Sequence, residues 1–136
     1  MGMYTELHYN VELRKDVPAQ VIAALEYMLD HCKPEARCDH PLFKTDRWSV
    51  MLSMDSCYFA AETHSTLRFD DISDQYYLCV RSNLKNYDSE IEKFIDWMDP
   101  YVDAFDGDFL GFHRYEESED PVIIRKRSQS DAEAKQ

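Results

Sequence analysis

Between residues 88 and 120 the chain concentrates carboxylate side chains that could bind a cation or a basic partner. This acidic window has twelve acidic residues and only two basic ones, Lys93 and Arg114, so it carries −10 of the formal charge of −12. The acidic residues are Asp88, Glu90, Glu92, Asp96, Asp99, Asp103, Asp106, Asp108, Glu116, Glu117, Glu119 and Asp120. Charge concentrated in one stretch creates a directed field, which speeds association with a basic partner and makes it sensitive to salt.

The first part of the acidic window predicts an amphipathic helix that begins between residues 86 and 89. Apolar residues recur at the period of a helix with one face on a sheet; they are Tyr87, Ile91, Phe94, Ile95 and Met98. Carboxylates share the opposite side, within an arc of about 80°; they are Asp88, Glu92, Asp96, Asp99 and Asp103. Their spacing of roughly 4.5 to 6 Å along the axis is in the range of a phosphate backbone's charge repeat. The Asp99-Pro100 pair should end or kink the helix, which would rotate Asp103 off this ladder.

Stacked like charges destabilise a helix by a few tenths of a kcal/mol per pair, which a basic partner would explain. The alternative is a solvated polar face with no partner. On the binding hypothesis, neutralising Glu92, Asp96 and Asp99 should remove binding without lowering stability.

Trp97 lies at the edge of the apolar stripe, where it is either an interface anchor or a packing residue. The expected partner-binding residues are Asp88, Glu92, Asp96, Trp97, Asp99, Asp103, Asp106 and Asp108.

Other residue groups point less specifically to chemistry. One loop holds the zinc-ligand types His31, Cys32, Cys38, Asp39 and His40, but their spacing matches no established zinc pairing. The carboxylates around Gly107 lack the ligand order of a calcium loop. We therefore predict no metal and no cofactor, and the absence of nucleophile, phosphate-loop and dinucleotide motifs leaves no catalytic residue to assign.

Composition describes a folded globule, with 44% hydrophobic and 13% aromatic residues. We expect one domain over residues 1–125 and a polar, disordered tail over residues 126–136. The basic cluster Arg125-Lys126-Arg127, where the two meet, should pair with the acidic surface or solubilise the tail. No apolar run approaches the roughly 20 residues that cross a bilayer, and the N-terminus lacks the features of a secretory signal. The sequence thus predicts a cytoplasmic protein with no membrane contact. Its acidity argues against direct nucleic-acid binding.

Hydrophobic periodicity predicts the order β-α-β-β-β-α-β-β. Alternation predicts strands near residues 4–13, 48–54, 65–69, 76–82, 109–115 and 122–125, and 3.6-residue periodicity predicts helices near residues 17–31 and 86–99. A short apolar run at residues 57–61 belongs to the same stretch of strand material between the helices. Strand meanders with helices on one face indicate an α+β fold, and a ferredoxin-like variant is the expected topology.

We conclude from the sequence that the protein is a non-enzymatic, acidic binding or inhibitor protein. It would place its 88–120 surface on a basic partner, such as a nucleic-acid-handling protein, and so act as a DNA mimic. Immunity proteins against nuclease toxins and phage-encoded anti-defence inhibitors share this profile, which is an analogy of composition. One alternative is a small enzyme or ligand-binding domain that uses the polar sheet face around His8 and His64. A homo-oligomer that buries aromatic side chains is another.

Overall fold

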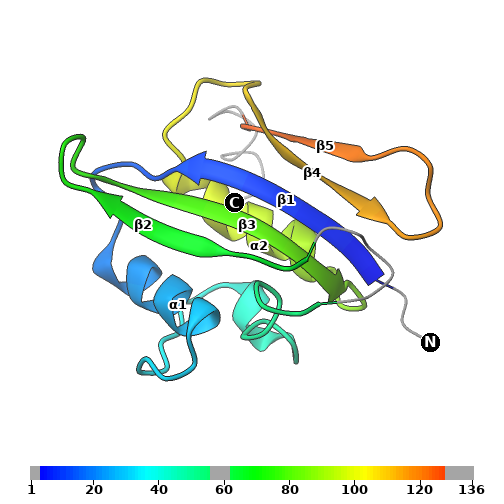
Figure 1. The fold of residues 1–136 in the computed structure, drawn as a ribbon. Coiled ribbons are helices and arrows are strands. Elements are labelled where there is room, and N and C mark those ends of the chain that lie inside the picture. The colour runs from blue at the N-terminus through cyan, green and yellow to red at the C-terminus, as the bar shows by residue number, and fades with distance from the viewer. Residues whose placement is uncertain (1–3, 56–61, 128–136) are drawn as a thin grey trace.

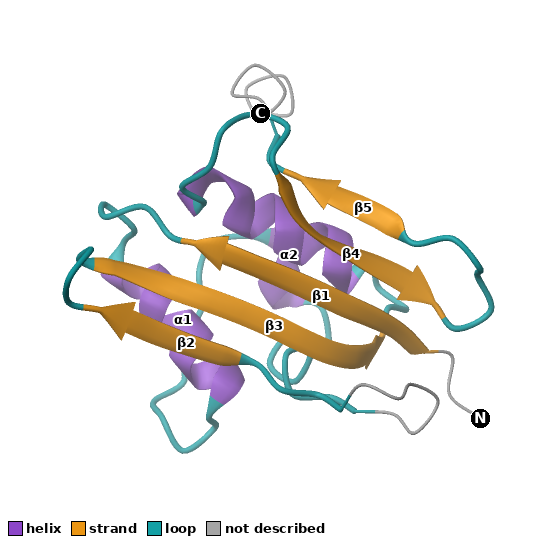
Figure 2. Cartoon of the chain, turned by 45° about the horizontal axis from the view of Figure 1, so that its top comes forward, coloured by secondary structure: helices purple, strands orange, loops and turns teal. Residues whose placement is uncertain are grey.

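A computed structural model describes residues 4–55 and 62–127 as a five-stranded antiparallel sheet with two helices behind one face (Figures 1 and 2). The strands are β1 (Tyr4–Glu12), β2 (Thr66–Asp70), β3 (Gln75–Lys85), β4 (Phe109–Tyr115) and β5 (Val122–Arg125). The α-helices are α1 (Ala19–Leu29) and α2 (Glu90–Met98), and short 3-10 helices cover η1 (Pro41–Lys44) and η2 (Asp99–Tyr101).

The strand order β2-β3-β1-β4-β5 confirms the α+β class and the ferredoxin-like variant. Each α-helix connects two strands that lie on either side of a third, and this split β-α-β arrangement, repeated twice, defines that topology. β1 is the central strand, with Leu7 paired to Ser82 of β3 and to His113 of β4. The fifth strand extends the sheet beyond β4, so β2 and β5 are its two edges.

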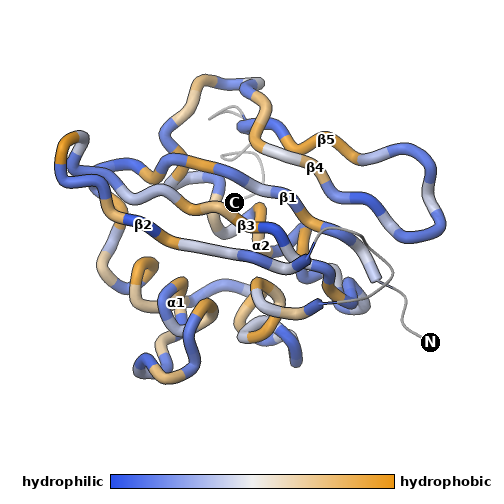
Figure 3. The backbone as a smooth tube through the Cα atoms, in the orientation of Figure 1, coloured by the Kyte–Doolittle hydropathy of each residue, from blue (hydrophilic) through white to orange (hydrophobic). Residues whose placement is uncertain are grey.

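Alternation along β1 decides which face of the sheet is buried. Leu7, Tyr9 and Val11 are buried beneath the helices, while His8 and Asn10 face the other side. The helices contribute apolar stripes to the same core, with Leu25 and Met28 from α1 fully buried. The apolar residues that repeat every second position in the strands and every 3.6 positions in the helices therefore pack into the same core. Figure 3 also shows a hydrophobic run along the edge strand β5.

One predicted strand is wrong. Residues 48–54 form turns and not a strand, and Trp48, Met51 and Leu52 are buried from these turns. Their spacing of three and four residues suits helical turns as well as it suits an interrupted alternation, so periodicity alone could not separate the two. The short apolar run at residues 57–61, which the sequence indicated as strand material, lies outside the described residues.

Pro100 ends the second helix where it was expected, because α2 stops at Met98 and continues only as the short η2. The start of α2 is held by Asn86, whose Oδ1 accepts a hydrogen bond of 2.9 Å from the amide of Ile91. No helix in residues 4–55 and 62–127 is long and apolar enough to span a membrane.

Candidate functional site

The structure divides the acidic window between the two ends of β4. Asp88 and Glu92 lie near the start of α2, and Glu117, Glu119 and Asp120 lie in the β4–β5 turn, at the end of β4 marked by Tyr115 (Figure 1). Asp103, Asp106 and Asp108 lie at the opposite end, in the loop that leads into β4. A strand of seven residues spans roughly 20 Å, so these exposed carboxylates form two separate surfaces.

The middle of the expected carboxylate ladder is paired within the chain. Asp99 is buried, and its two oxygens accept hydrogen bonds of 3.1 Å from Lys126 Nζ and from the Arg127 amide. Asp96 accepts 2.7 Å from Arg127 Nη1 and lies 2.9 Å from His40 Nε2. These two carboxylates therefore fix the segment after β5 and the loop before η1 against α2, and they do not present free charge to a partner.

Trp97 and Glu90 are also inside the molecule. Trp97 is 4% exposed and packs edge-on against Phe43 and Phe94, so it is a packing residue and not an exposed anchor. Glu90 is fully buried, accepts 2.8 Å from the Asp88 amide, and has its pKa raised by burial. The helical periodicity of the sequence had correctly separated an apolar side of α2 from a polar side. It could not show that Lys126, Arg127 and the loop before η1 cover part of that polar side.

Asp96 should make stability depend on pH. Partial burial raises the pKa of Asp96, but hydrogen bonds from His40 and Arg127 and the charge of Arg127 outweigh this and hold the pKa below its ordinary 3.8. A carboxyl with a lower pKa in the folded state stabilises the protein above its ordinary pKa and loses that contribution as pH falls through the folded value. Because the side chain is 46% exposed, the contribution should be below about 1 kcal/mol.

Urea unfolding of wild type and Asp96→Asn tests this expectation. The variant should be less stable at neutral pH, and the difference should shrink below about pH 3, where the wild-type carboxyl is also neutral. Glu117→Gln, at an exposed turn position, is the charge-matched control and should match wild type at both pH values. A difference for Asp96→Asn that is equal at both pH values would contradict the pairing.

At one end of the sheet, two loops that are distant in sequence both carry exposed carboxylates. We call them together the Phe105 surface, which comprises the turn 70–74 and the loop 103–108. Asp103 Oδ2 accepts a hydrogen bond of 2.7 Å from Gln75 Nε2, which joins the loop to the start of β3. Its carboxylates are Asp70, Asp71, Asp74, Asp103, Asp106 and Asp108. The sequence analysis had not connected the turn 70–74 with the acidic window.

Each loop of the Phe105 surface exposes one large apolar side chain. Phe105 is 84% exposed and Ile72 is 93% exposed. Carboxylates stand on both sides of each apolar residue in the sequence. The two segments are Asp-Asp-Ile-Ser-Asp and Asp-Ala-Phe-Asp-Gly-Asp. That pattern was available as a signal, but only the fold shows that both apolar side chains are exposed at the same end of the sheet.

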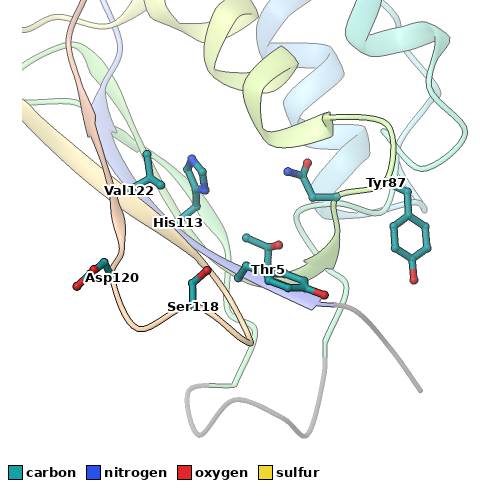
Figure 4. A pocket seen from close by; sticks show the side chains of 8 residues that line it. Thr5, Tyr87, His113, Ser118, Asp120 and Val122 are labelled. Atoms are coloured by element: carbon teal, nitrogen blue, oxygen red, sulfur yellow. The ribbon is translucent and has the colours of Figure 1, made fainter.

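At the other end of β4 a pocket of about 330 Å³ opens between the start of α2, the start of β1 and the β4–β5 turn (Figure 4). Thr5, His113 and Tyr115 reach it from neighbouring strands, and Asn86 and Asp120 lie on its sides. Sequence reasoning missed this pocket. The sequence did contain a signal for it. Side chains alternate along a strand, so His113 and Tyr115 lie on one face of β4, the helix side, and Phe112 and Arg114 lie on the other.

The polar sheet face around His8 and His64 is the other predicted site. His8 stacks on Phe112 with ring centroids 4.6 Å apart, and its Nε2 lies 3.6 Å from Glu6. Arg81 is the strand neighbour of His8, and its carbonyl accepts 2.7 Å from the amide of His64. The two histidines therefore flank the same residue of β3, and the His113 pocket lies on the opposite face of the sheet.

The candidate zinc loop distributes its side chains among other partners. His31 Nε2 is 2.6 Å from the Ser49 carbonyl, His40 pairs with Asp96, and Cys38 Sγ is 3.7 Å from the Gln20 carbonyl. Within residues 4–55 and 62–127, no three His, Cys, Asp or Glu side chains come together as metal ligands.

Comparison with known proteins adds no relative: no family model, no curated protein and no solved structure matches the chain.

Proposed function

We propose that the protein is a non-enzymatic binding protein that uses the Phe105 surface to engage a basic protein partner. The observation that carries this proposal is an exposed phenylalanine and an exposed isoleucine on two ordered, carboxylate-rich loops at one end of the sheet. Exposed large apolar side chains bordered by polar residues are a feature of interaction sites. An inhibitor of a nucleic-acid-handling protein remains our preferred class, because such partners present basic surfaces.

Hydrogen bonds hold Phe105 in place before any partner arrives. The Phe105 amide donates to Asp108 Oδ2 at 3.0 Å, and the Asp108 amide donates back to the Phe105 carbonyl at 3.0 Å. The Gly107 amide donates 2.8 Å to the Lys126 carbonyl, in a backbone conformation (φ +86°) that suits glycine. A loop that is already ordered loses little further conformational entropy on binding, which favours affinity.

The turn 70–74 is ordered in the same way. Asp70 accepts hydrogen bonds from the Ile72 amide at 3.1 Å and from Ser73 Oγ at 2.9 Å. These hydrogen bonds, the Ile72 amide first, lower the pKa of Asp70 and keep it ionised. The partner that complements this surface is therefore an apolar pocket bordered by lysine or arginine.

Capture from a lysate of the source cell, with variants as bait, tests the proposal. Phe105→Ser should lose a basic protein that wild type retains and that moderate salt releases, because screening weakens exposed charge pairs. With the purified partner, Phe105→Ser should weaken affinity by about tenfold or more, as expected for a central apolar contact. Asp106→Asn should act mainly by slowing association, since the Asp106 side chain makes no hydrogen bond or ion pair with the residues that the structure describes, and its charge acts at long range.

Ile123→Ser is the matched control, because Ile123 is an exposed apolar residue of β5 that lies outside the Phe105 surface and does not line the pocket at the other end of β4. It should retain the partner as wild type does. Retention of the same protein by Phe105→Ser, or the capture of no basic protein by wild type, would contradict the proposal.

A further inference from the structure

The pocket at the Tyr115 end of β4 is separate from the Phe105 surface and has its own chemistry. Register places Thr5 opposite Tyr115 and Val122 opposite His113, so three adjacent strands form its floor on the helix side of the sheet. The start of α2, with Asn86, closes another side, and the β4–β5 turn brings in Asp120 (Figure 4). A volume of about 330 Å³ is enough for a small organic group rather than a whole metabolite of drug size.

The charged side chain in the wall of this pocket is acidic. The residues that line it include Asp120 but neither lysine nor arginine. Glu92 of α2 acts electrostatically on His113, and Glu116 and Glu117 act on Tyr115. Asn86 Nδ2 donates a hydrogen bond of 3.2 Å to Glu92 Oε2 and so keeps that carboxylate beside the pocket. A cationic ligand would therefore meet Asp120 in the pocket wall and Glu92 close to His113. No lysine or arginine lines the wall, although Arg47 stacks on Tyr87 and Arg114 donates to the Ser118 carbonyl from outside it.

A hydroxyl on the pocket wall that the fold does not use is a second, independent indication of a ligand. Thr5 is 5% exposed and lines the pocket, and its hydroxyl has no hydrogen-bond partner among residues 4–55 and 62–127. Figure 4 shows Thr5 and His113 bordering the same hollow. The residue is nearly buried, but its hydroxyl oxygen is not one of the fully buried atoms that lack a partner, so this oxygen is reached from the pocket. A donor or acceptor bound in the pocket would complete its hydrogen bonding.

His113 supplies a neutral ring to this site. Burial lowers the pKa of His113, although Glu92 opposes the shift, so at neutral pH the ring is uncharged. An uncharged imidazole does not repel a cation and can accept one hydrogen bond from it. Tyr115 adds an aromatic ring, and aromatic rings together with carboxylates are the usual surroundings of bound ammonium and guanidinium groups.

We propose that this pocket binds an organic cation, a guanidinium or primary ammonium group, between Asp120, Glu92 and the side chains of Thr5, His113 and Tyr115. The group is carried either by a free small molecule or by an arginine or lysine side chain of another protein. Asp120 and Glu92 provide the counter-charge, and the Thr5 hydroxyl and the His113 ring accept hydrogen bonds from its N–H groups. This site does not depend on the Phe105 surface, so the failure of one proposal leaves the other in place.

Titration of the full chain with argininamide, followed by NMR, tests this proposal. Argininamide is used in its Nα-acetyl form, so that the guanidinium is its only charge, and it should shift the resonances of His113 and Thr5 in a saturable way. Nα-acetylcitrullinamide, which has nearly the same shape without the guanidinium charge, should not. An acetylated and amidated Gly-Gly-Arg-Gly-Gly peptide distinguishes the two sources. Binding of the peptide as tight as that of argininamide would indicate a protein side chain, and binding of argininamide alone would indicate a free molecule.

Asp120→Asn should weaken argininamide binding by roughly fivefold, the effect of losing one partly exposed counter-charge. Glu119→Gln is the matched control, because it removes the same charge from the neighbouring turn position, which does not line the pocket. Glu119→Gln should bind as wild type does. Equal shifts with citrullinamide, equal weakening by both variants, or no saturable shift at His113 with either argininamide or the peptide would overturn the proposal.

Discussion

Gly111→Ala should lower the free energy of unfolding by about 4 kcal/mol or more, among the largest effects that a single substitution has. A Cβ atom at residue 111 would overlap the carbonyl oxygen of His8 and lie 2.8 Å from its carbonyl carbon and 3.0 Å from Tyr9 Cα. All three are backbone atoms of the central strand β1, so no side-chain rotation can relieve the overlap. β4 would have to move away from β1, and the pairs from Thr5–Tyr115 to Tyr9–Gly111 would weaken together.

Urea unfolding followed by tryptophan fluorescence measures this effect, because both Trp48 and Trp97 are buried. Gly107→Ala is the matched control: nothing lies within 4 Å of a Cβ at that position, and only its positive φ is strained. That strain should cost about 1 to 2 kcal/mol. A stability of Gly111→Ala within about 1 kcal/mol of wild type would mean that β4 does not approach β1 as described.

Gly111 also connects the fold to both proposed sites. β4 begins beside the loop that carries Phe105 and ends at His113 and Tyr115 of the pocket. Displacement of this one strand should therefore impair both sites at once. The single-site variants Phe105→Ser and Asp120→Asn, in contrast, should each affect only their own end of the strand.

The topology was predictable because each element has a clear period. Alternation in β1 and the apolar stripe of α2 both reflect burial on one side, and this side was assigned correctly from the sequence. Residues 48–54 were not predictable, because a short apolar segment satisfies more than one pattern. The strand order followed from the sequence of elements and from the preference for antiparallel neighbours with short connections.

The candidate sites were less predictable, since they depend on segments that meet only in three dimensions. Asp99 and Asp96 belong to an acidic stripe in sequence, yet Lys126 and Arg127 return to that stripe after β5. The start of β3, which follows the turn 70–74, is joined to the loop 103–108 through a hydrogen bond between Gln75 and Asp103. Charge counting along the chain cannot reveal either arrangement, because it does not include distance in space.

Lys126→Met should lower the free energy of unfolding by about 3 kcal/mol, because it leaves a buried carboxylate without its cation. The side chains of Asp99 and Lys126 are only 3% and 13% exposed, and the Arg127 amide would be the remaining donor in this pair of contacts. The buried Tyr9 lies close enough for the charge of Asp99 to contribute to its raised pKa, after the larger effect of burial, so the hydroxyl remains neutral. Water does not reach this site freely to replace the ammonium group.

Arg125→Met is the matched control. It removes the same charge one residue earlier, from an exposed side chain whose Nη1 donates to the Gly107 carbonyl at 3.3 Å, and it should change stability by less than about 1 kcal/mol. The double variant Asp99→Leu/Lys126→Met should recover part of the loss, since replacing a buried pair by apolar residues is often close to neutral. Equal stability of Lys126→Met and Arg125→Met would contradict a structural role for the pair.

This outcome also decides how the acidic surface should be tested. If Lys126 and Asp99 stabilise each other, neutralising Asp96 and Asp99 together with Glu92 will destabilise the protein, contrary to the expectation from sequence. Loss of binding in that triple variant could then follow from partial unfolding alone. Asp106→Asn and Asp120→Asn avoid this ambiguity, because each removes one exposed charge outside the Asp96 and Asp99 pairs.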